Sequence, residues 1–470
     1  MKRGYTDVLI GLQYGDEGKA RVIDKLLQKV NYSIVAKFNA GPNAGHVIEV
    51  ENKRVILHSV PAGVFYSDKL LYVGSGCVIN PEKFLQEISD IEKIGVELKN
   101  RLRISSNVSL IQPHHIILDN IQGGFIGTTR NGVGPVYADQ AVRAEDKIIK
   151  NLKIGSYLSD PEGFRNYVML NLKNIVEIYK INFEIDVEQF VQVFHDSVLQ
   201  LREYVEYDPF FLDKLVGLEK NILFEGANSC MLDVVYGVTP FTTSSRTIAA
   251  AAYTGGDISL KHHNKIIGVA KAIMSRVGNG PFISEYGGRK SEEYCGEDAG
   301  KKYIKEVEEQ SYNVEELLKS GDLFKIGIAL RILGNEYGST TKRPRRLGIF
   351  DLVLLKQSCR LNAVDEIYIN KIDCLYELSK TSLSGIPIVT SYVLNGKLID
   401  YVPTTSEDMY NARPVIEYWP HISDVSSAKT YEELSVEVKY FIKTLQERIC
   451  VKIAGIGVGP EREQFIEIIE

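Results

Sequence analysis

The sequence predicts an α/β fold: a large, mostly parallel central sheet with helices on its faces. Short apolar runs typical of buried strands recur along the chain, and helix-like stretches such as 84–94 and 431–448 lie between some of them. Alternation of this kind is typical of parallel sheets with helical crossovers. The strand-like runs are residues 8–10, 34–36, 71–73, 222–224, 265–270, 366–369, 386–389 and 451–456.

The chain of 470 residues contains neither a low-complexity linker nor an internal repeat, so we expect a single domain over 1–470. Pro387 has no backbone N–H, and the run 386–389 is therefore expected at a sheet edge at best. The charged, glycine-containing segment 285–312 is interpreted as an excursion on the surface. Its run 290–293 (Lys-Ser-Glu-Glu) is interpreted as a solvated face.

Composition excludes several classes of protein. The net charge of −6 offers no basic surface for nucleic acid. No apolar run reaches the ~18 residues that a membrane helix needs, and the first residues lack the apolar core of a secretory signal. The six cysteines contain no C-x-x-C pair, so neither a zinc site nor a disulfide framework is expected. We therefore expect a cytoplasmic protein without a membrane or nucleic-acid partner.

The most informative motif is Gly-Leu-Gln-Tyr-Gly-Asp-Glu-Gly-Lys at 11–19, between a strand-like run and a helical apolar face. A glycine-rich turn with a lysine at a helix N-terminus is suited to cradle phosphate. The motif departs from a standard Walker A loop at Gln13 and Ala20. Its acidic pair, Asp16 and Glu17, would repel phosphate unless a carboxylate binds a metal or takes a proton from substrate. For the loop alone, a tight turn with solvated carboxylates is the alternative.

A second motif, Asn-Lys-Ile-Asp at 370–373, closes a predicted strand. The carboxylate of Asp373 can accept hydrogen bonds from the N1–H and exocyclic amine of guanine, while the stem of Lys371 packs over the base. Any lysine and aspartate at a strand end could match this pattern by chance. Together with the phosphate loop, it makes a guanine nucleotide the leading interpretation.

Four further loops carry groups suited to anions. The turn 41–46 ends in His46, which could donate to a phosphate oxygen or act as a general acid. The loops 127–135 and 242–245 offer hydroxyls and backbone donors for a phosphate. The loop 338–346 holds four cations and indicates a small anionic substrate. The alternatives are ordinary turns, a solvated histidine and a surface basic cluster paired with nearby carboxylates.

These motifs, in this order, resemble the adenylosuccinate synthetase family. The resemblance covers nearly the whole chain and implies the family's P-loop-like GTP-binding architecture. It implies a GTP-dependent ligase of AMP biosynthesis that joins IMP and L-aspartate to form adenylosuccinate, with GDP, phosphate and Mg²⁺. The matching segments are 11–24, 43–46, 127–143, 225–227, 242–245, 275–282, 339–346, 370–373 and 459–462.

The resemblance also implies roles in catalysis. Asp16 would remove the N1 proton of the purine and contact Mg²⁺, which the backbone carbonyl of Gly45 would also approach. His46 would stabilise the phosphoryl group as it passes from GTP to the purine 6-oxygen, with Lys19 neutralising charge. The residues implied for GTP are Gly15, Glu17, Gly18, Lys19, Gly45, His46, Lys371, Asp373, Gly457 and Gly459.

Two further sets follow from the same resemblance. Arg143 would reach the nucleotide of a partner subunit, which implies a homodimer. The residues implied for IMP are Asp16, Asn43, Thr129, Arg143, Asn228, Thr243 and Arg343. The residues implied for aspartate are Val277, Thr340, Thr341, Arg343 and Arg345.

Departures from the family pattern fall mostly around the nucleotide and the amino acid. Asn228 replaces a glutamine, Arg246 a small polar residue, and Lys342 a glycine. They leave two alternatives open: a paralogous ligase acting on another 6-oxopurine nucleotide such as dGMP, or on another amine, and a non-catalytic guanine-nucleotide sensor. Relatives that use dGMP tend to lose the catalytic aspartate, so the presence of Asp16 favours IMP.

Overall fold

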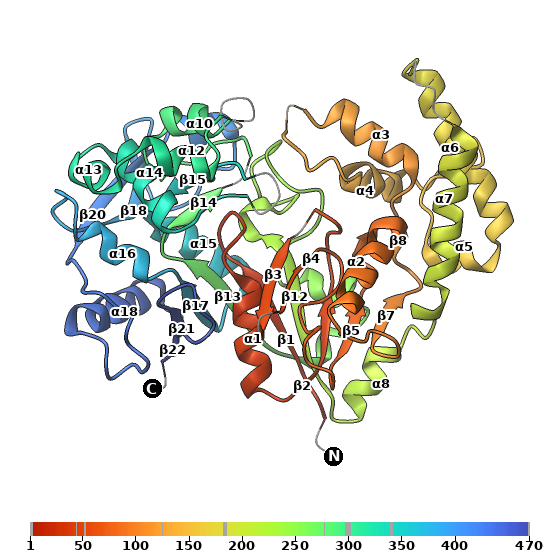
Figure 1. Cartoon of the computed structure of the whole chain (residues 1–470), viewed down its shortest axis with the longest axis horizontal. Helices are drawn as coiled ribbons and strands as arrows, with labels where there is room; N and C mark the ends of the chain where they lie inside the picture. Colours follow the sequence, from red (N-terminus) through yellow and green to blue (C-terminus); the bar gives the residue numbers. More distant parts are fainter. Residues whose placement is uncertain are drawn as a thin grey trace. The chain divides into compact units, whose positions relative to one another are not determined.

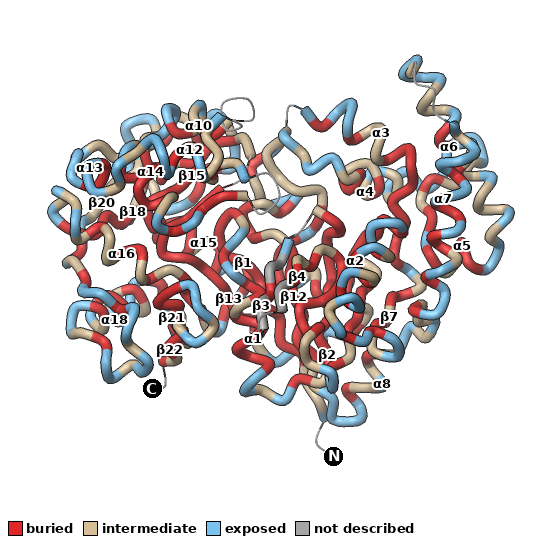
Figure 2. Tube along the Cα trace, in the orientation of Figure 1, coloured by how far each residue is buried: buried red, intermediate tan, exposed pale blue. Residues whose placement is uncertain are grey.

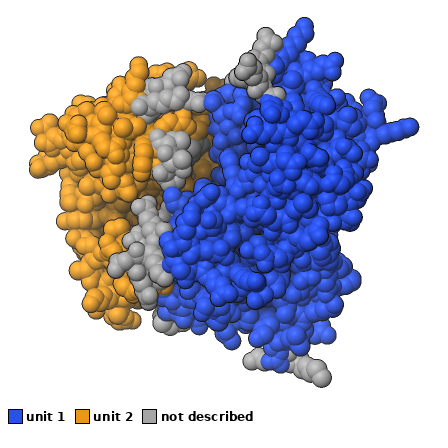
Figure 3. Space-filling view, turned by 45° about the vertical axis from the view of Figure 1, so that its right-hand side comes forward, with its two compact units in different colours: residues 1–9, 20–227, 243–265 blue, residues 10–19, 228–242, 266–470 orange. Residues whose placement is uncertain are grey.

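The computed structural model describes most of the chain, which forms two compact units, each built from several segments (Figure 3). The described residues are 3–43, 45–50, 53–124, 126–181, 186–276, 278–296, 302–338 and 342–468. Unit 1 comprises Met1–Leu9, Ala20–Ala227 and Thr243–Lys265, and unit 2 comprises Ile10–Lys19, Asn228–Thr242 and Ile266–Glu470. Each unit is described by itself.

Unit 1 is a parallel α/β structure (Figure 1). Its parallel strands pair in the order β11 (Val205–Glu206), β7 (Leu102–Ser105), β5 (Leu70–Val73), β2 (Tyr32–Lys37) and β12 (Asn221–Ser229). Its short pairs are β3 (His46–Val50) with β4 (Lys53–Leu57), β6 (Val78–Ile79) with β8 (Ser109–Leu110), and β9 (Ala144–Glu145) with β10 (Ile148–Ile149). Its helices are α1 (Lys19–Lys29, whose first residue belongs to unit 2), α2 (Pro81–Lys93), α3 (Pro113–Gln122), α4 (Val133–Val142), α5 (Ile154–Ser159), α6 (Pro161–Ile178), α7 (Val187–Gln200), α8 (Phe211–Gly217) and α9 (Ala251–Gly255).

Unit 2 combines a parallel ladder with a second, mixed sheet. The ladder is β13 (His263–Lys271), β17 (Glu366–Asn370) and β21 (Lys452–Gly457), with β22 (Phe465–Glu467) antiparallel at its edge. The second sheet holds β16 (Phe350–Asp351), β18 (Ile386–Leu394), β19 (Lys397–Ile399) and β20 (Arg413–Trp419), and β14 (Met274–Arg276) pairs with β15 (Arg346–Gly348). The helices are α10 (Arg289–Cys295), α12 (Lys305–Ser311), α13 (Val314–Lys319), α14 (Leu323–Leu333), α15 (Leu352–Asn362), α16 (Asp373–Leu378), α17 (Ser406–Asn411) and α18 (Val436–Ile449).

The predicted fold class is confirmed. Each unit has a sheet of mostly parallel strands with helices beside it, and β1 (Thr6–Gly11) directly precedes the glycine-rich motif. Every predicted strand-like run falls on a strand, and the strands are largely buried (Figure 2). Helix 84–94 lies within α2 and its cap, whereas α18 begins only at Val436, where the Ser435 hydroxyl caps its first turn. Among the described residues, every helix is too short or too polar to cross a bilayer.

The expectation of an edge position for 386–389 is wrong. Strand β18 is internal to the second sheet, with β20 on one side and β16 and β19 also paired to it. Pairing with β16 begins only at Ile388, and Pro387 faces Tyr418 of β20. The proline is tolerated because it lies at the start of the strand, before the β16 ladder needs an N–H donor.

The expectation of a solvated face for 285–312 is also wrong in part. Glu285 and Glu308 are both buried. Glu285 pairs with Arg346 at 2.5 Å, and Glu308 binds Arg331 through both carboxylate oxygens at 2.8 and 2.9 Å. These bidentate arginine–carboxylate pairs compensate the desolvation cost of burying the charges. The run 290–293 is mixed, because Ser291 is buried while Glu293 is exposed.

Candidate functional site

The predicted phosphate loop connects β1 to α1, as the glycine-rich motif requires. Gly15 has φ +99° and Gly18 has φ +84°, both in the left-handed region that favours glycine. A Cβ on Gly18 would lie 2.7 Å from the Asn370 amide nitrogen, so a side chain at Gly18 would displace Asn370. Asn370 in turn donates a 2.7 Å hydrogen bond to the carbonyl of Glu17. The loop is therefore held against the end of β17.

The carboxylate of Glu17 lies inside this loop and is fully buried. It accepts hydrogen bonds from the backbone N–H groups of Gln13 at 3.1 Å and Gly15 at 2.9 Å. The Ser229 hydroxyl donates to it at 2.5 Å, and the ammonium of Lys19 lies 3.0 Å away. Glu17 therefore organises the loop and holds Lys19, the lysine that the sequence predicts for phosphate.

Asp16, the other member of the acidic pair, has a different environment. Its side chain is 36% exposed and its backbone is left-handed, with φ +57°. A carboxylate oxygen lies 2.9 Å from the guanidinium of Arg345. Asp16 thus presents a carboxylate outward from the phosphate loop, where a substrate or a cation can reach it, while Glu17 faces inward.

The loop is also tied to the end of β13. The Gln13 amide donates to the carbonyl of Lys271 at 3.1 Å and accepts from its N–H at 3.0 Å. The ammonium of Lys271 binds the buried carboxylate of Glu336 at 2.8 and 2.9 Å. Glu336 also contacts Arg345 at 3.0 Å, so the same carboxylate adjoins the partner of Asp16. Burial opposes ionisation of Arg345, but Asp16 and Glu336 raise its pKa above the ordinary value.

The predicted guanine tetrapeptide lies at the carboxyl end of β17, with Asp373 opening α16. The Lys371 ammonium binds Glu336 at 2.7 Å and the carbonyl of Gly334. The N–H of Ile372 donates to the carbonyl of Gly457 at 3.0 Å. The structure thereby brings the tetrapeptide together with Gly457, one of the residues implied for GTP, at the edge where ligands bind in parallel sheets.

Several residues predicted for IMP gather within unit 1. The Asn43 amide lies 3.5 Å from the Thr243 hydroxyl. The Asn131 amide donates to the Thr129 hydroxyl at 3.1 Å and to the carbonyl of Pro42 at 3.3 Å. Hydroxyls and amides converge here from the 41–46, 127–135 and 242–245 loops, a composition suited to a phosphate.

The remaining predicted residues are more scattered. Arg143 is exposed at the C-terminus of α4, and Arg343 is half-buried. The amide nitrogen of Asn228 is buried without a hydrogen-bond partner in the part of the chain that the structure describes, as expected of a group that awaits a ligand. Gly45 is exposed; the side chain of His46, and all of Val277, Thr340 and Thr341, lie outside the described residues.

The cationic loop 338–346 agrees with only part of the surface-cluster interpretation. Arg345 and Arg346 are indeed paired with carboxylates, the second with Glu285 and with Glu292 at 3.3 Å. Arg346 is buried and Arg345 is only 16% exposed, so these two arginines do not belong to a surface cluster, whereas Lys342 is exposed. Arg345 contacts Asp16 and therefore lies against the predicted phosphate loop.

One group of metal-type side chains lies in unit 1: His114, His115 and Asp139. Both histidines place Nε2 near the same Asp139 oxygen, at 3.3 and 2.9 Å. The His115 Nδ1 accepts the backbone N–H of Gln112 at 3.0 Å, so its proton is on Nε2. Burial lowers the pKa of His114 to about 3, and this histidine is neutral. The group is a hydrogen-bonded triad and does not fit a metal, which would need the unprotonated Nε2 of His115.

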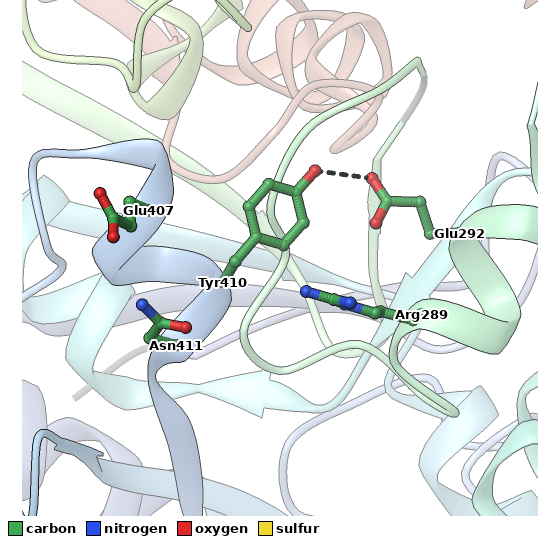
Figure 4. Close-up of a pocket in the computed structure, with 5 residues that line it drawn as sticks. All are labelled: Arg289, Glu292, Glu407, Tyr410 and Asn411. Carbon is green, nitrogen blue, oxygen red and sulfur yellow. Dashed lines mark hydrogen bonds between the residues drawn. The ribbon is translucent and has the colours of Figure 1, made fainter.

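A polar pocket of about 440 Å³ opens beside the 285–312 segment (Figure 4). The Tyr410 hydroxyl donates to Glu292 at 3.0 Å, and the guanidinium of Arg289 lies 5.9 Å from the centre of the same ring. Glu407 and Asn411 complete the lining. Of the residues predicted for substrates, none of those that the structure describes lines this pocket.

Sequence reasoning missed four residues that shape the site: Gln13, Ser229, Lys271 and Glu336. Gln13 lies inside the phosphate-loop motif, but from the sequence it was interpreted only as a departure from the Walker A pattern. Glu336 lies just before the cationic loop 338–346, and an excess of arginine there signals the need for a buried carboxylate. Ser229 and Lys271 lie at the ends of β12 and β13, where a parallel sheet gathers its ligand-binding groups.

Comparisons with known proteins agree with the family resemblance of the sequence motifs. The family model described as adenylosuccinate synthetase matches residues 8–466. "Adenylosuccinate synthetase 2" of Cupriavidus pinatubonensis is 38% identical over 466 residues, covering 99% of this chain and 97% of that protein.

Solved structures give the same result. Fully ligated adenylosuccinate synthetase from Plasmodium falciparum superposes with a TM-score of 0.83 at 30% identity, covering 99% of this chain and 100% of the other. The cyanophage S-2L succinoaminodeoxyadenylate synthetase, solved with dGMP and dATP, matches with a TM-score of 0.58 at 14% identity, covering 99% of this chain and 96% of the other. At that identity the second likeness concerns the fold alone.

Proposed function

Because the chain belongs to the adenylosuccinate synthetase family, we propose that it is a GTP-dependent ligase that joins IMP and L-aspartate to form adenylosuccinate. GTP phosphorylates the 6-oxygen of the purine, which then leaves as phosphate when the aspartate amine attacks C6. A hydroxypurine oxygen is a poor leaving group, and phosphorylation makes it a good one. The protein's task is positioning and charge neutralisation.

The contact between Asp16 and Arg345 is the observation that carries this proposal. N1 and C6 are adjacent atoms of the purine ring. A carboxylate that takes the N1 proton must therefore lie within a few ångströms of the group that holds the incoming amino acid. The 2.9 Å separation of Asp16 and Arg345 meets that requirement, with Asp16 as the base and Arg345 as a clamp for an aspartate carboxylate.

The phosphate loop supports the phosphoryl-transfer step. Lys19 would neutralise charge on the GTP phosphates, and Glu17 holds both this lysine and the loop backbone in place. Lys371 and Asp373 would hold the guanine base, with Gly457 and Gly459 beside it. His46 would stabilise the phosphoryl group in transfer. In unit 1, the hydroxyls and amides around Asn43 and Thr243 suit the IMP phosphate.

Magnesium is part of the proposal. Carboxylate and carbonyl oxygens are the donors that Mg²⁺ prefers, and the Asp16 carboxylate remains 36% exposed, so the residues present fit the ion. Asp16 and the carbonyl of Gly45 would hold it. Bound there, Mg²⁺ would supply positive charge to the transferring phosphates.

We further propose that the whole chain acts as one synthetase-like domain and as a homodimer in the cytoplasm. The family match over nearly the full length supports the first point. The exposed position of Arg143, at the end of α4, supports its reach toward the active site of a second copy. Sedimentation of the purified protein across a concentration series tests the dimer.

The proposed reaction has a direct test. Purified protein should release inorganic phosphate only when GTP, IMP and L-aspartate are all present with Mg²⁺. IMP labelled with ¹⁸O at the 6-position should place that label in the released phosphate. Phosphate release without label transfer would contradict the 6-phosphoryl route, and no turnover with the trio would contradict the substrate assignment.

A second candidate is ligation on another 6-oxopurine nucleotide, such as dGMP. Asn228 motivates this candidate because its side chain is shorter than the family's glutamine by one methylene, and its buried amide nitrogen has no hydrogen-bond partner among the described residues. Turnover with dGMP in place of IMP, in the same assay, would establish it. The presence of Asp16 favours IMP.

A further inference from the structure

We infer that Glu336 is a positioning residue that aligns the amino-acid clamp and the guanine-binding lysine of the proposed active site. The inference rests on the proposed function, since Arg345 and Lys371 are the residues assigned there to aspartate and guanine. Glu336 touches neither substrate in this assignment and acts through the two cations that it holds.

The geometry of Glu336 is that of a shared anchor within unit 2. The residue is fully buried, just after α14. One carboxylate binds three cations: Lys271 at 2.8 Å, Lys371 at 2.7 Å and the Arg345 guanidinium at 3.0 Å. These cations come from the end of β13, the end of β17 and the residue before β15, so one side chain fixes three separate elements.

Only an ionised carboxylate at position 336 can hold these three cations together. Burial alone would raise the pKa of Glu336, but Lys271, Lys371 and Arg345 outweigh burial and hold it well below the ordinary value. With the carboxylate ionised, the three cations can lie close together. Without that charge they would repel one another in a low-dielectric interior and move apart.

Each contact has a consequence for a substrate. One arm of the Arg345 guanidinium is held by Glu336, which leaves the other arm directed at Asp16. A planar guanidinium fixed at one arm presents its other arm and its Nε–H in a single orientation, as a bidentate clamp requires. The Lys371 ammonium is likewise held by Glu336 and by the carbonyl of Gly334, so its stem is fixed for packing over a base.

The test compares steady-state kinetics of the full-length wild type and Glu336→Gln. The change keeps the size and removes the charge. Because each lost charged hydrogen bond is worth about tenfold or more, the KM values for aspartate and for GTP should each rise about tenfold. The KM for IMP should stay within about twofold, because the Asn43 and Thr243 cluster is untouched.

Two further variants separate positioning from general damage. Glu87→Gln removes another buried carboxylate, one that accepts the N–H groups of His58, Ser59 and Val60 in unit 1, and should leave both KM values unchanged. Glu336→Asp keeps the charge and should restore part of the lost aspartate and GTP affinity. If Glu336→Gln does not fold, Glu336→Asp carries the test, because its shorter side chain cannot reach all three cations and should still raise both KM values.

The outcomes are distinct. A Glu336→Gln enzyme whose aspartate and GTP KM values match wild type, or rise together with that of IMP by the same factor, would overturn the inference alone. An inactive wild type would overturn the proposed function. In that case calorimetric titration with a non-hydrolysable GTP analogue still decides on Glu336: about tenfold weaker binding by Glu336→Gln supports the role, and equal binding overturns it.

Discussion

The guanidinium of Arg345 lies 2.9 Å from the carboxylate of Asp16. In the proposed reaction these residues serve different substrates, Asp16 the purine and Arg345 the amino acid. Without substrates each is the other's partner. In that reaction, aspartate would offer Arg345 new carboxylates and would release Asp16 to face N1 of the purine. The pair would thus keep the base occupied until the nucleophile is in place.

Replacing Asp16 by asparagine should abolish the chemical step and leave the fold and GTP affinity intact. The substitution removes the base, which is worth about 10²–10⁴-fold in kcat, while the loop is held by Glu17 rather than by Asp16. Single-turnover kinetics, calorimetry with GTP and thermal unfolding measure the three quantities. Asp90→Asn is a matched control, because Asp90 is an exposed carboxylate paired with Lys93. An active Asp16→Asn enzyme would show that Asp16 is not the base.

Replacing Arg345 by lysine should raise the KM for aspartate about tenfold or more, because an ammonium cannot bind a carboxylate through two parallel hydrogen bonds. The KM for IMP should change by less than about twofold. Steady-state kinetics with each substrate varied in turn measures both. Arg448→Lys, which alters an exposed arginine paired with Glu417, is the control. Unchanged aspartate kinetics would remove Arg345 from the amino-acid site.

The sequence sufficed for the parallel strands and for the loops at their ends, because apolar periodicity and glycine-rich turns are local signals. It did not predict that Glu17 would turn into the loop while Asp16 turns outward. That difference depends on Ser229 and Asn370, which are far away in the chain. The role of Glu336 was not predicted for the same reason, because it depends on Lys271 and Lys371, which are brought beside it only by the fold.

In the 285–312 segment, the sequence predicted exposed charges where the structure has buried ion pairs. Its charges were expected in solvent because isolated runs of charge usually lie there. Glu308 is instead buried against Arg331, whose guanidinium also donates to the carbonyl of Arg345 at 3.0 Å. A partner more than twenty positions along the chain cannot be read from the composition of the run itself.

Lys342 has φ +56° at a position where the family usually has glycine. Lys342→Gly should therefore raise the free energy of unfolding by about 1 kcal/mol, since the left-handed region costs a side chain roughly that much. Lys180→Gly is a matched control, because Lys180 has φ +48° and lies in unit 1. Thermal and urea unfolding should show the same gain for both variants.

The same pair of variants tests substrate choice. If the chain uses IMP and aspartate, neither variant should change its preference across a panel of purine nucleotides and amines. If the alternative ligase reaction is correct, Lys342→Gly alone should shift the enzyme toward aspartate. A shift caused by Lys180→Gly as well would point to a general effect of stability and would remove Lys342 from the question of specificity.

Asp351 makes unfolding depend on pH. Burial raises the pKa of its carboxyl from 3.8 to about 6, although the Tyr392 hydroxyl and the backbone N–H of Leu354 donate to it. The folded state therefore holds this proton more tightly than the unfolded state. Stability should fall as pH rises from about 4 to about 6, by up to about 3 kcal/mol, and the loss should be complete above pH 6.

Asp351→Asn should remove this dependence, because an amide caps the first turn of α15 and remains neutral throughout. At pH 7.5 the variant should unfold at a higher urea concentration than wild type, and near pH 4 the two should converge. Asp400→Asn, at an exposed carboxylate, should leave the wild-type profile unchanged. A variant that is less stable than wild type by the same amount at every pH would mean that the Asp351 carboxyl does not titrate between pH 4 and 6.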